Sequence, residues 1–505
     1  MKNITIIGGG ACGTAVFIEL VLQMAASAIA RDVKLRIIEK EKALGYGLAF
    51  GTDQPGHLLN TQAELMGIHV HEPEHFSEWL KDMGGSNRDD VKGPQDTANT
   101  YTTRSLYGKY VAGQVKHYMA KAAEIGISVE IVHAEAMDIQ RKSGGYEVIC
   151  AEGNRYPSDY VVLALGTPKP KNYQNLSAYS GYIDFPWPSE RIIDKVQPKD
   201  QVGILGTSLS AIDAVMTLID NGHQGPISLF SPDGMLPRVQ PEKPRDYERQ
   251  IFTINHIHRI KREALSQVTV KEVFGLFQKE VEAHAPSKTI DWTSLKREKK
   301  KAEEMLYEDI AIAEKGGDAL SDVIQSLRYV AGVVWQMWDT QEKLRFKRWL
   351  GSYWTVYRHP MPLYNAYRLK ALFETKQLKV FPALDEVEFD KQHRNFMMKL
   401  KHSAPEQVDK LINATGIPSS LAEMGCPLVD RLLEKKYLIP YSVGGALIDE
   451  LTMQTLSPKG GEGIYALGHL VNGMLLDVNA VWYNVRTAAT LCNHLLSKIK
   501  HGYIS

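Results

Sequence analysis

The first forty residues combine two short apolar runs with one long amphipathic segment. Residues 3–7 form an uncharged, β-branched run of the kind found in buried parallel strands. Residues 14 to about 30 predict a helix, and residues 33–38 predict a second buried strand that ends at Glu39. The turn between the first strand and the helix, at 8–13, reads GGGACG and matches GxGxxG. This order of elements predicts the βαβ start of a dinucleotide-binding Rossmann domain.

Each part of this turn has a physical task in holding a diphosphate. Gly8 allows the tight turn, Gly10 lets the backbone approach the pyrophosphate, and Gly13 permits close packing of helix on strand. The helix N-terminus offers unpaired N–H groups and a partial positive charge to the phosphates. Glu39 stands where a carboxylate can accept hydrogen bonds from both ribose hydroxyls. The alternative is a glycine turn that binds no ligand.

The glycine motif alone does not separate FAD from NAD, but the chain after Glu39 favours FAD. Residues 45–51 and 57–60 form a loop-rich insertion where simple dehydrogenases usually continue the sheet. Such an insertion can enclose the far half of a large cofactor. We therefore expect FAD at the first site.

A second, degenerate glycine motif follows another buried run at 201–205. Gly206 begins the turn, Ser208 stands where a second glycine is commonest, and a helix is expected to end near residue 221. Serine is small enough for close backbone approach, and its hydroxyl can bind phosphate. The motif predicts an NAD(P)H site, and the alternative is an ordinary turn between strand and helix.

The next strand, at 227–230, ends at Ser231 rather than at an acidic residue. This removes the usual carboxylate for a 2′-hydroxyl and leans toward NADPH over NADH. Arg238, Lys243 and Arg245 are candidates for a 2′-phosphate, although basic loop residues are more often simply solvated.

The chain contains two similar series of strands, each tied to one glycine motif. Each series has a strand, a hairpin and a buried strand that leads to a turn at Gly166 or Gly416. A final strand at 463–468 and a helix from about 479 are expected to complete the first sheet. The fold class is therefore α/β, with two Rossmann-like dinucleotide-binding lobes and a helical insertion in the second.

The predicted domains follow from this arrangement. An FAD-binding domain covers 1–170 and is completed by about 405–505. An NAD(P)H-binding domain covers 195–400, and its helical insertion spans about 240–354. Within the insertion, the basic run at 296–301 is expected to form an exposed helix face rather than a nucleic-acid site.

Composition narrows the possible partners. The 505 residues include 59 Lys and Arg against 59 Asp and Glu, so no charge excess favours nucleic acid or an anionic membrane. The four cysteines are far apart in sequence and form no CxxC or Cys/His cluster, which predicts no metal site and excludes electron transfer through a CxxC pair. The N-terminus imitates a signal peptide, but a strand, a glycine turn and a helix explain it better. We expect a cytoplasmic protein of undetermined oligomeric state.

Several motifs resemble those of the two-dinucleotide FAD/NAD(P)-binding proteins over nearly the whole chain. The resemblance is closest to a bacterial group with a GxAF/Y-GT element and an LN element after the flavin motif, matched here at 47–52 and 59–61. Residues 354–359 are similar to the Arg-His element of that group, although Pro360 replaces a frequent arginine. Residues 466–468 resemble its C-terminal flavin contact. The group includes flavin-dependent hydroxylases of amino acids and of a purine, and its architecture is similar to that of N-hydroxylating and Baeyer–Villiger monooxygenases.

The resemblance implies an FAD- and NAD(P)H-dependent monooxygenase that hydroxylates a small polar metabolite with molecular oxygen through a C4a-(hydro)peroxyflavin. Asn60 is the candidate residue at the flavin edge, or it caps the following helix. Arg358 is the candidate for an anionic substrate group, or it forms a surface ion pair. His57 and His359 are weaker candidates for proton donors. The alternatives are an FAD-dependent NAD(P)H oxidoreductase without productive oxygen chemistry and a noncatalytic FAD-binding regulator.

The candidate cofactor-binding residues come from both glycine motifs and from the turns that face them. They are Gly8, Gly10, Ala11, Cys12, Gly13, Glu39, Lys40, Ala136, Gly166, Gly206, Thr207, Ser208, Ser210, Gly416 and Gly468.

Overall fold

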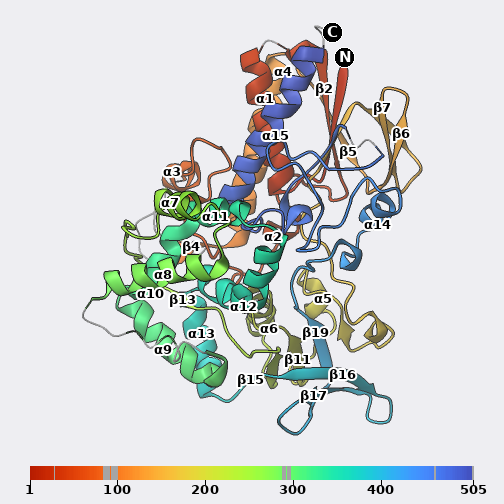
Figure 1. Cartoon of the computed structure of the whole chain (residues 1–505). Helices are drawn as coiled ribbons and strands as arrows, with labels where there is room; N and C mark the ends of the chain where they lie inside the picture. Colours follow the sequence, from red (N-terminus) through yellow and green to blue (C-terminus); the bar gives the residue numbers. More distant parts are fainter. Residues whose placement is uncertain are drawn as a thin grey trace.

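Two parallel β-sheets organise the chain (Figure 1). The computed structural model describes residues 1–27, 29–83, 91–92, 101–286, 290, 292, 297–459 and 462–502. Within these residues, both sheets have five strands, in the orders β20-β9-β1-β2-β5 and β10-β19-β11-β12-β15. All the pairings within the two sheets are parallel. The predicted α/β class with two Rossmann-like lobes is confirmed.

The first lobe is built from both ends of the chain. Its central strand β1 is almost fully buried, as expected of an uncharged β-branched run covered on both faces. The long helices α1, α4 and α15 lie side by side at one end of the molecule, near both termini (Figure 1). The strands and helices are β1 (Lys2–Ile7), β2 (Val33–Glu39), β5 (Ser128–His133), β9 (Tyr160–Leu163), β20 (Ile464–Ala466), α1 (Ala11–Ser27), α4 (Arg104–Glu124) and α15 (Val481–Gly502).

The second lobe repeats this arrangement around its own buried strand. Its elements are β10 (Tyr182–Ile183), β11 (Val202–Leu205), β12 (Ile227–Phe230), β15 (Leu378–Phe381), β19 (Lys410–Asn413), α5 (Glu190–Ile193), α6 (Leu209–Asp220) and α13 (Leu363–Glu374). The second lobe was predicted to end near residue 400, whereas β19 pairs with both β10 and β11. Its strand partners therefore extend the second lobe beyond the predicted limit.

Each lobe also carries a small antiparallel sheet, as the repeated hairpins predicted. These sheets are β6 (Ala136–Lys142) with β7 (Gly145–Cys150) and β8 (Arg155–Ser158), and β16 (Leu384–Asp390) with β17 (Asn395–Leu400) and β18 (Glu406–Val408). Each joins two strands of its parallel sheet, so the internal repeat is structural. Shorter elements, α2 (Gly47–Phe50), α3 (His75–Asp82), β3 (Val91–Lys92), β4 (Tyr101–Thr102) and α14 (Pro427–Glu434), belong to connecting segments.

Helices fill the predicted insertion, which lies between β13 (Val239–Gln240) and β14 (Met361–Pro362). They begin and end at α7 (Ile254–Ala264), α8 (Val270–His284), α9 (Ala302–Glu314), α10 (Ala319–Ser326), α11 (Ala331–Met337) and α12 (Thr340–Arg358). The insertion also packs on the first lobe, because the Trp335 indole N–H donates to the carbonyl oxygens of Gly473 and Met474 at 3.0 and 3.1 Å.

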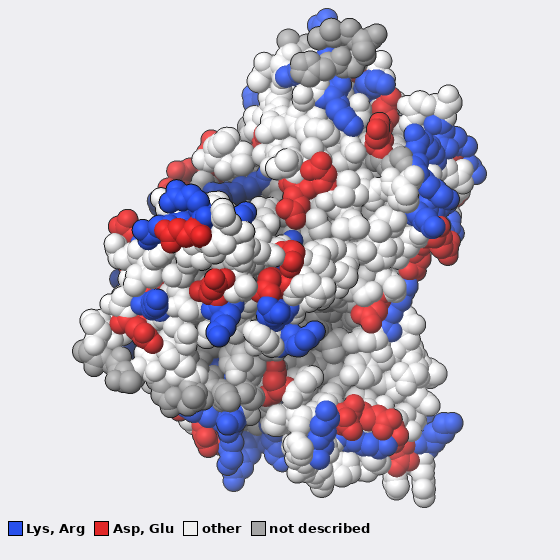
Figure 2. Space-filling model, in the orientation of Figure 1, with Lys and Arg blue, Asp and Glu red and all other residues white. Residues whose placement is uncertain are grey.

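The basic run of the insertion differs from its prediction. Lys296 lies outside the described residues, and the next residues form a single 3-10 turn, Arg297–Lys299. Arg297 is buried and makes a two-armed ion pair with Asp309, so the run is not simply an exposed helix face. On the face shown in Figure 2, basic and acidic side chains lie interspersed. No helix among the described residues is both long and apolar enough to cross a membrane.

Candidate dinucleotide-binding sites

The first glycine turn packs tightly against its neighbouring strands. Gly8 has a φ of +105°, and a Cβ atom there would lie 2.1 Å from the carbonyl oxygen of Ala164. A Cβ atom at Gly13 would lie 1.8 Å from the carbonyl oxygen of Gly8. Both positions therefore require glycine, for the turn and for the close approach of α1 to β1.

The predicted insertion docks directly on this turn. The Gly45 N–H donates to the Gly9 carbonyl oxygen at 2.8 Å, and a Cβ atom at Gly10 would lie 3.3 Å from Cα of Gly47. A side chain at Gly10 would therefore press on the backbone of the insertion. A turn free of side chains suits a diphosphate, which needs close contact with backbone N–H groups.

A cleft of about 940 Å³ opens from the turn and crosses toward the second lobe. This volume is at the upper end for small-molecule sites, as a dinucleotide requires. Of the candidate cofactor-binding residues, those that line the cleft are Gly8, Gly10, Glu39, Lys40 and Gly166. Ala11, Cys12 and Gly13 lie at the N-terminus of α1, at its edge. Ala136 is buried at the start of β6, and its neighbour Glu135 lines the cleft instead.

Glu39 ends β2 at the expected place, and its carboxylate accepts hydrogen bonds from the Gly9 N–H at 2.6 Å and the Glu41 N–H at 3.0 Å. These bonds hold the carboxylate beside the glycine turn, where a ribose would lie. Lys40 is exposed and forms a long ion pair of 3.8 Å with Glu135 across the mouth of the cleft.

The cleft also contains groups that the sequence patterns did not single out. Aromatic side chains of Tyr46, Phe50, Phe185 and Trp187 line it, which a search for glycine motifs cannot find. Near the cleft but outside its lining, His469 follows Gly468, and its Nδ1 has no hydrogen-bond partner among the described residues. Burial lowers the pKa of His469 to about 4, so its ring stays neutral and can accept or donate one hydrogen bond.

Cys12 lies beside Gly468, where an added Cβ atom would be 3.4 Å from the Cys12 Sγ. Burial raises the pKa of the Cys12 thiol to about 12, which keeps it protonated and unreactive. All four cysteines are free thiols, and each lies in the described part of the chain. No group of His, Cys, Asp and Glu among the described residues is arranged to hold a metal ion.

The second glycine turn shares the tight strand packing of the first but not its cleft. Gly206 has a φ of +120°, and a Cβ atom there would lie 2.5 Å from the Ala414 carbonyl oxygen. Ser208 is the N-cap of α6, and Ser210 lies in its first turn. The Thr207 hydroxyl donates to the Ser231 Oγ at 3.2 Å, and Gly416 has a φ of +84°. None of these residues lines the large cleft, so the helix N-terminus is presented on a more open surface.

Two of the three basic residues named for a 2′-phosphate, Arg238 and Arg245, are already paired. Arg238 is buried and forms ion pairs with Asp309 at 3.2 Å and Asp318 at 3.0 Å. Arg245 donates to the carbonyl oxygens of Gly316 and Gly317. These two side chains hold the helical insertion together, so the interpretation of either as a phosphate ligand is wrong.

His57 connects the two lobes. Its Nδ1 lies 2.9 Å from the Thr52 hydroxyl, and its Nε2 lies 2.9 Å from the Thr217 hydroxyl on α6. Arg104 forms a second link, an ion pair of 2.8 Å with buried Asp213. Burial lowers the pKa of His57. Because both of its ring nitrogens are hydrogen-bonded to hydroxyl groups, His57 links two segments rather than serving as a proton donor.

Arg358 is not on the surface, which overturns the alternative of a surface ion pair. It is buried at the end of α12, and its nearest carboxylate oxygen, on buried Asp477, is 3.7 Å away. His359 follows, and desolvation together with the charge of Arg358 lowers its pKa to about 4. Asn60 is half-buried. Its segment lies beside β4, where the neighbouring Leu59 N–H donates to the Thr102 carbonyl oxygen at 2.9 Å.

Comparison with known proteins agrees with this geometry. Residues 5–168 match the family described as FAD-NAD(P)-binding. The uncharacterized protein YdhS of Escherichia coli is 24% identical over 320 residues, 58% of this chain and 56% of that protein. The 3-dehydro-bile acid delta(4,6)-reductase of Clostridium scindens is 26% identical over 178 residues, 33% of this chain and 39% of that protein. The matches thus span less than two thirds of either curated relative.

Solved structures share the fold over nearly the entire chain. L-lysine 6-monooxygenase from Pseudomonas syringae has a TM-score of 0.58 at 13% identity, covering 98% of this chain and 99% of that one. Ornithine hydroxylase from Pseudomonas aeruginosa has a TM-score of 0.56 at 14% identity, covering 99% and 100%. Bacillithiol disulfide reductase from Staphylococcus aureus has a TM-score of 0.51 at 12% identity, covering 99% of each. The predicted resemblance to two-dinucleotide-binding flavoproteins is confirmed, with an FAD/NAD(P)-binding domain at residues 5–168.

Proposed function

We propose that the protein is an FAD- and NAD(P)H-dependent monooxygenase that hydroxylates a small organic metabolite. The observation that carries this proposal is the cleft at the first glycine turn, which starts at a helix N-terminus and crosses to a lobe with its own glycine turn. Lysine and ornithine hydroxylases share this fold.

The first turn and its surroundings suit a permanently bound FAD. Gly10 leaves room for the diphosphate, the N-terminus of α1 stabilises its charge, and Glu39 holds the adjoining ribose. When bound, FAD takes a hydride from NAD(P)H and supplies the electrons that activate molecular oxygen. Cys12 stays a protonated thiol beside the cleft, so it offers no thiolate to take up these electrons.

The second turn suits a nicotinamide dinucleotide that binds and leaves. Gly206 and Ser208 place the N-terminus of α6 at an open surface, where a diphosphate meets backbone N–H groups and the Ser208 hydroxyl. Asn60 lies on the insertion of the first lobe, where an amide can orient the nicotinamide or a polar substrate group. Arg358 offers its guanidinium to an anionic group of the substrate.

Anaerobic and aerobic flavin spectroscopy tests the proposal. We expect purified protein to carry FAD, and anaerobic NADPH or NADH to bleach its absorbance within seconds. With a suitable substrate, NAD(P)H consumption should match hydroxylated product, whereas rapid release of hydrogen peroxide with every candidate substrate would contradict the monooxygenase assignment.

A flavin reductase is the second candidate, favoured by the names of two similar proteins, the bacillithiol disulfide and bile acid reductases. It predicts fast reduction by NAD(P)H and transfer to an organic acceptor without oxygen. Flavin that neither nucleotide reduces would instead indicate a noncatalytic FAD-binding regulator.

A further inference from the structure

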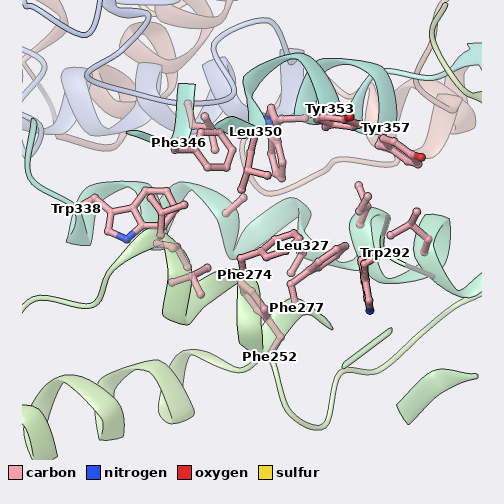
Figure 3. Close-up of a pocket in the computed structure, with 18 residues that line it drawn as sticks. Phe252, Phe274, Phe277, Trp292, Leu327, Trp338, Phe346, Leu350, Tyr353 and Tyr357 are labelled. Atoms are coloured by element: carbon pink, nitrogen blue, oxygen red, sulfur yellow. The ribbon is translucent and has the colours of Figure 1, made fainter. Parts of the chain in front are cut away.

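An aromatic cavity of about 280 Å³ lies inside the helical insertion, apart from the dinucleotide cleft. Figure 3 shows rings from α8 and α12 and from the segments around them, pointing toward a common space. Protein interiors rarely leave an apolar space of this size unfilled, and an apolar cavity is suited to a hydrophobic ligand. Residues that line it include Phe252, Phe274, Phe277, Trp338, Phe346 and Leu350.

Three charged residues adjoin this cavity along the chain, two of them buried and one, Arg328, half-buried. Leu327, Tyr357 and Leu476 line the cavity, and the residue after each is charged. These three neighbours, Arg328, Arg358 and Asp477, are called here the charged cluster. They come from the 3-10 turn after α10 (Leu327–Tyr329), the end of α12 and the segment before α15, so three separate parts of the chain bring charge to one place.

The charged cluster has unused hydrogen-bonding capacity. The Nε atoms of Arg328 and Arg358 and both carboxylate oxygens of Asp477 are buried without a hydrogen-bond partner among the described residues. Burial and the charge of Arg358 lower the pKa of Arg328 to about 10, and burial raises the pKa of Asp477. Glu64 offsets part of the charge of Arg328. Unsatisfied buried groups are costly, and a bound polar group removes that cost.

The charged cluster also lies toward the proposed flavin site. Tyr101 interacts electrostatically with Arg328, and the strand that holds Tyr101 is hydrogen-bonded to the segment of Asn60. Asp477 lies on the segment that follows Leu470, a residue of the dinucleotide cleft. The charged cluster is therefore joined through the chain to residues of both the aromatic cavity and the cleft.

We propose that the aromatic cavity and the charged cluster together form the substrate site, and that the substrate is an amphiphilic carboxylate. The carboxylate accepts hydrogen bonds from Arg328 and Arg358, and the aromatic or aliphatic body fills the cavity. This inference rests on the proposed function, whose substrate it narrows from small organic metabolites to carboxylates with a large apolar part. A planar guanidinium suits a carboxylate, and the cavity offers its apolar surface to the remainder of the ligand.

Calorimetric titration of the holoprotein without NAD(P)H tests the site with a matched pair of probes. The probes are 2-naphthylacetate and the neutral 2-naphthylacetamide, which share an apolar body and differ in charge. We expect the carboxylate to bind at least tenfold more tightly than the amide. Arg328→Met and Arg358→Met should remove this preference, whereas Arg348→Met, an exposed arginine of α12, should keep it.

Filling the cavity tests the apolar half of the site. Val334→Phe places a ring in the cavity and should weaken both probes at least tenfold, while Val333→Phe on the exposed side of α11 should leave them unchanged. Ala331→Phe is a second filling variant if Val334→Phe does not fold, and circular dichroism and flavin content report folding.

Equal binding of both probes, no binding of either, or unchanged binding in the filled variants would overturn the proposal. An arginine variant that loses flavin but keeps the carboxylate preference would also overturn it, because the charged cluster would then serve the cofactor. Probe binding by a protein that never consumes NAD(P)H would sustain this site while refuting the monooxygenase.

Discussion

The two glycine turns begin alike and end differently. Gly8 and Gly206 both have positive φ, and a Cβ atom at either would lie against the carbonyl oxygen of the alanine that directly follows the neighbouring strand. The first turn then continues through Gly10 and Gly13 into a cleft of about 940 Å³, while the second continues through Ser208 onto an open surface. The shared glycine thus reflects how a strand turns into a helix, and the later positions reflect what is bound.

This difference matches the two roles proposed for the dinucleotides. A cofactor that stays bound through many turnovers needs a surrounding cleft, whereas a nucleotide that leaves after each hydride transfer needs an accessible surface. The loop at 45–51 supplies the surrounding wall only at the first turn. If the comparison is correct, substitutions in the first turn should weaken FAD binding, and substitutions in the second turn should slow flavin reduction by NAD(P)H without loss of FAD.

The largest effect is expected from Gly10→Val. The added side chain would press against Gly47 and cover backbone N–H groups that the diphosphate needs. We expect the affinity for FAD to fall by about 100-fold, a loss of roughly 3 kcal/mol of binding free energy, so that the purified protein carries little flavin. Absorbance spectra and flavin titration measure it. Gly113→Ala, at an exposed helix position with open space, is the control and should retain full flavin. A yellow Gly10→Val protein would refute the assignment of this turn.

The next effect is expected from Ser208→Glu at the second turn. A carboxylate at the N-cap of α6 would repel the nucleotide diphosphate. We expect kcat/KM for flavin reduction by NADPH and NADH to fall by about 100-fold, with flavin content unchanged. Ser208→Gly, which restores the commoner motif residue, should stay within about threefold of the parent protein. Stopped-flow reduction under anaerobic conditions separates these outcomes, and loss of FAD from the glutamate variant would contradict two independent sites.

How far the sequence could predict these sites depends on how local their partners are. The first strand, turn and helix were predictable because the strand, the glycine turn, the helix and the second strand follow one another within a single βαβ unit. Arg238 could not be assigned correctly, because its partners Asp309 and Asp318 lie some seventy residues or more further along. The aromatic cavity could not be predicted from the sequence either, because its rings come from several helices. The amphipathic pattern of a helix predicts only that one face is buried.

A third, smaller effect concerns His469, whose neighbour Gly468 lies beside Cys12 of the first glycine turn. Its pKa of about 4 in the native state lies below the ordinary value of 6.5 expected in the unfolded chain. The native state therefore binds fewer protons than the unfolded state below pH 6.5, and stability falls as pH falls from 6.5 to 4. In His469→Asn, the free energy of unfolding should fall by about 2–3 kcal/mol less between pH 6.5 and pH 4 than in the parent protein. Urea unfolding of the holoprotein at the two pH values measures this difference. His402→Asn, an exposed position, is the control. An unchanged pH slope in His469→Asn would mean that this ring is already solvated.

The smallest effect is expected at Asp233, which qualifies the sequence-based preference for NADPH. That preference rested on Ser231 at the end of β12, but the structure places an acidic residue two positions later. The Asp233 Oδ1 accepts hydrogen bonds from the Ser231 hydroxyl at 3.3 Å and from the Met235 N–H at 3.1 Å. A carboxylate here can accept from a ribose 2′-hydroxyl and repel a 2′-phosphate. We expect Asp233→Ala to raise the ratio of kcat/KM for NADPH over NADH by about five- to tenfold, or roughly 1 kcal/mol. Asp233→Asn should raise the ratio similarly, because it removes the charge and keeps the size. An unchanged ratio in both variants would show that the ribose does not reach this side of the turn, and the second glycine motif would then bind its nucleotide through the N-terminus of α6 alone.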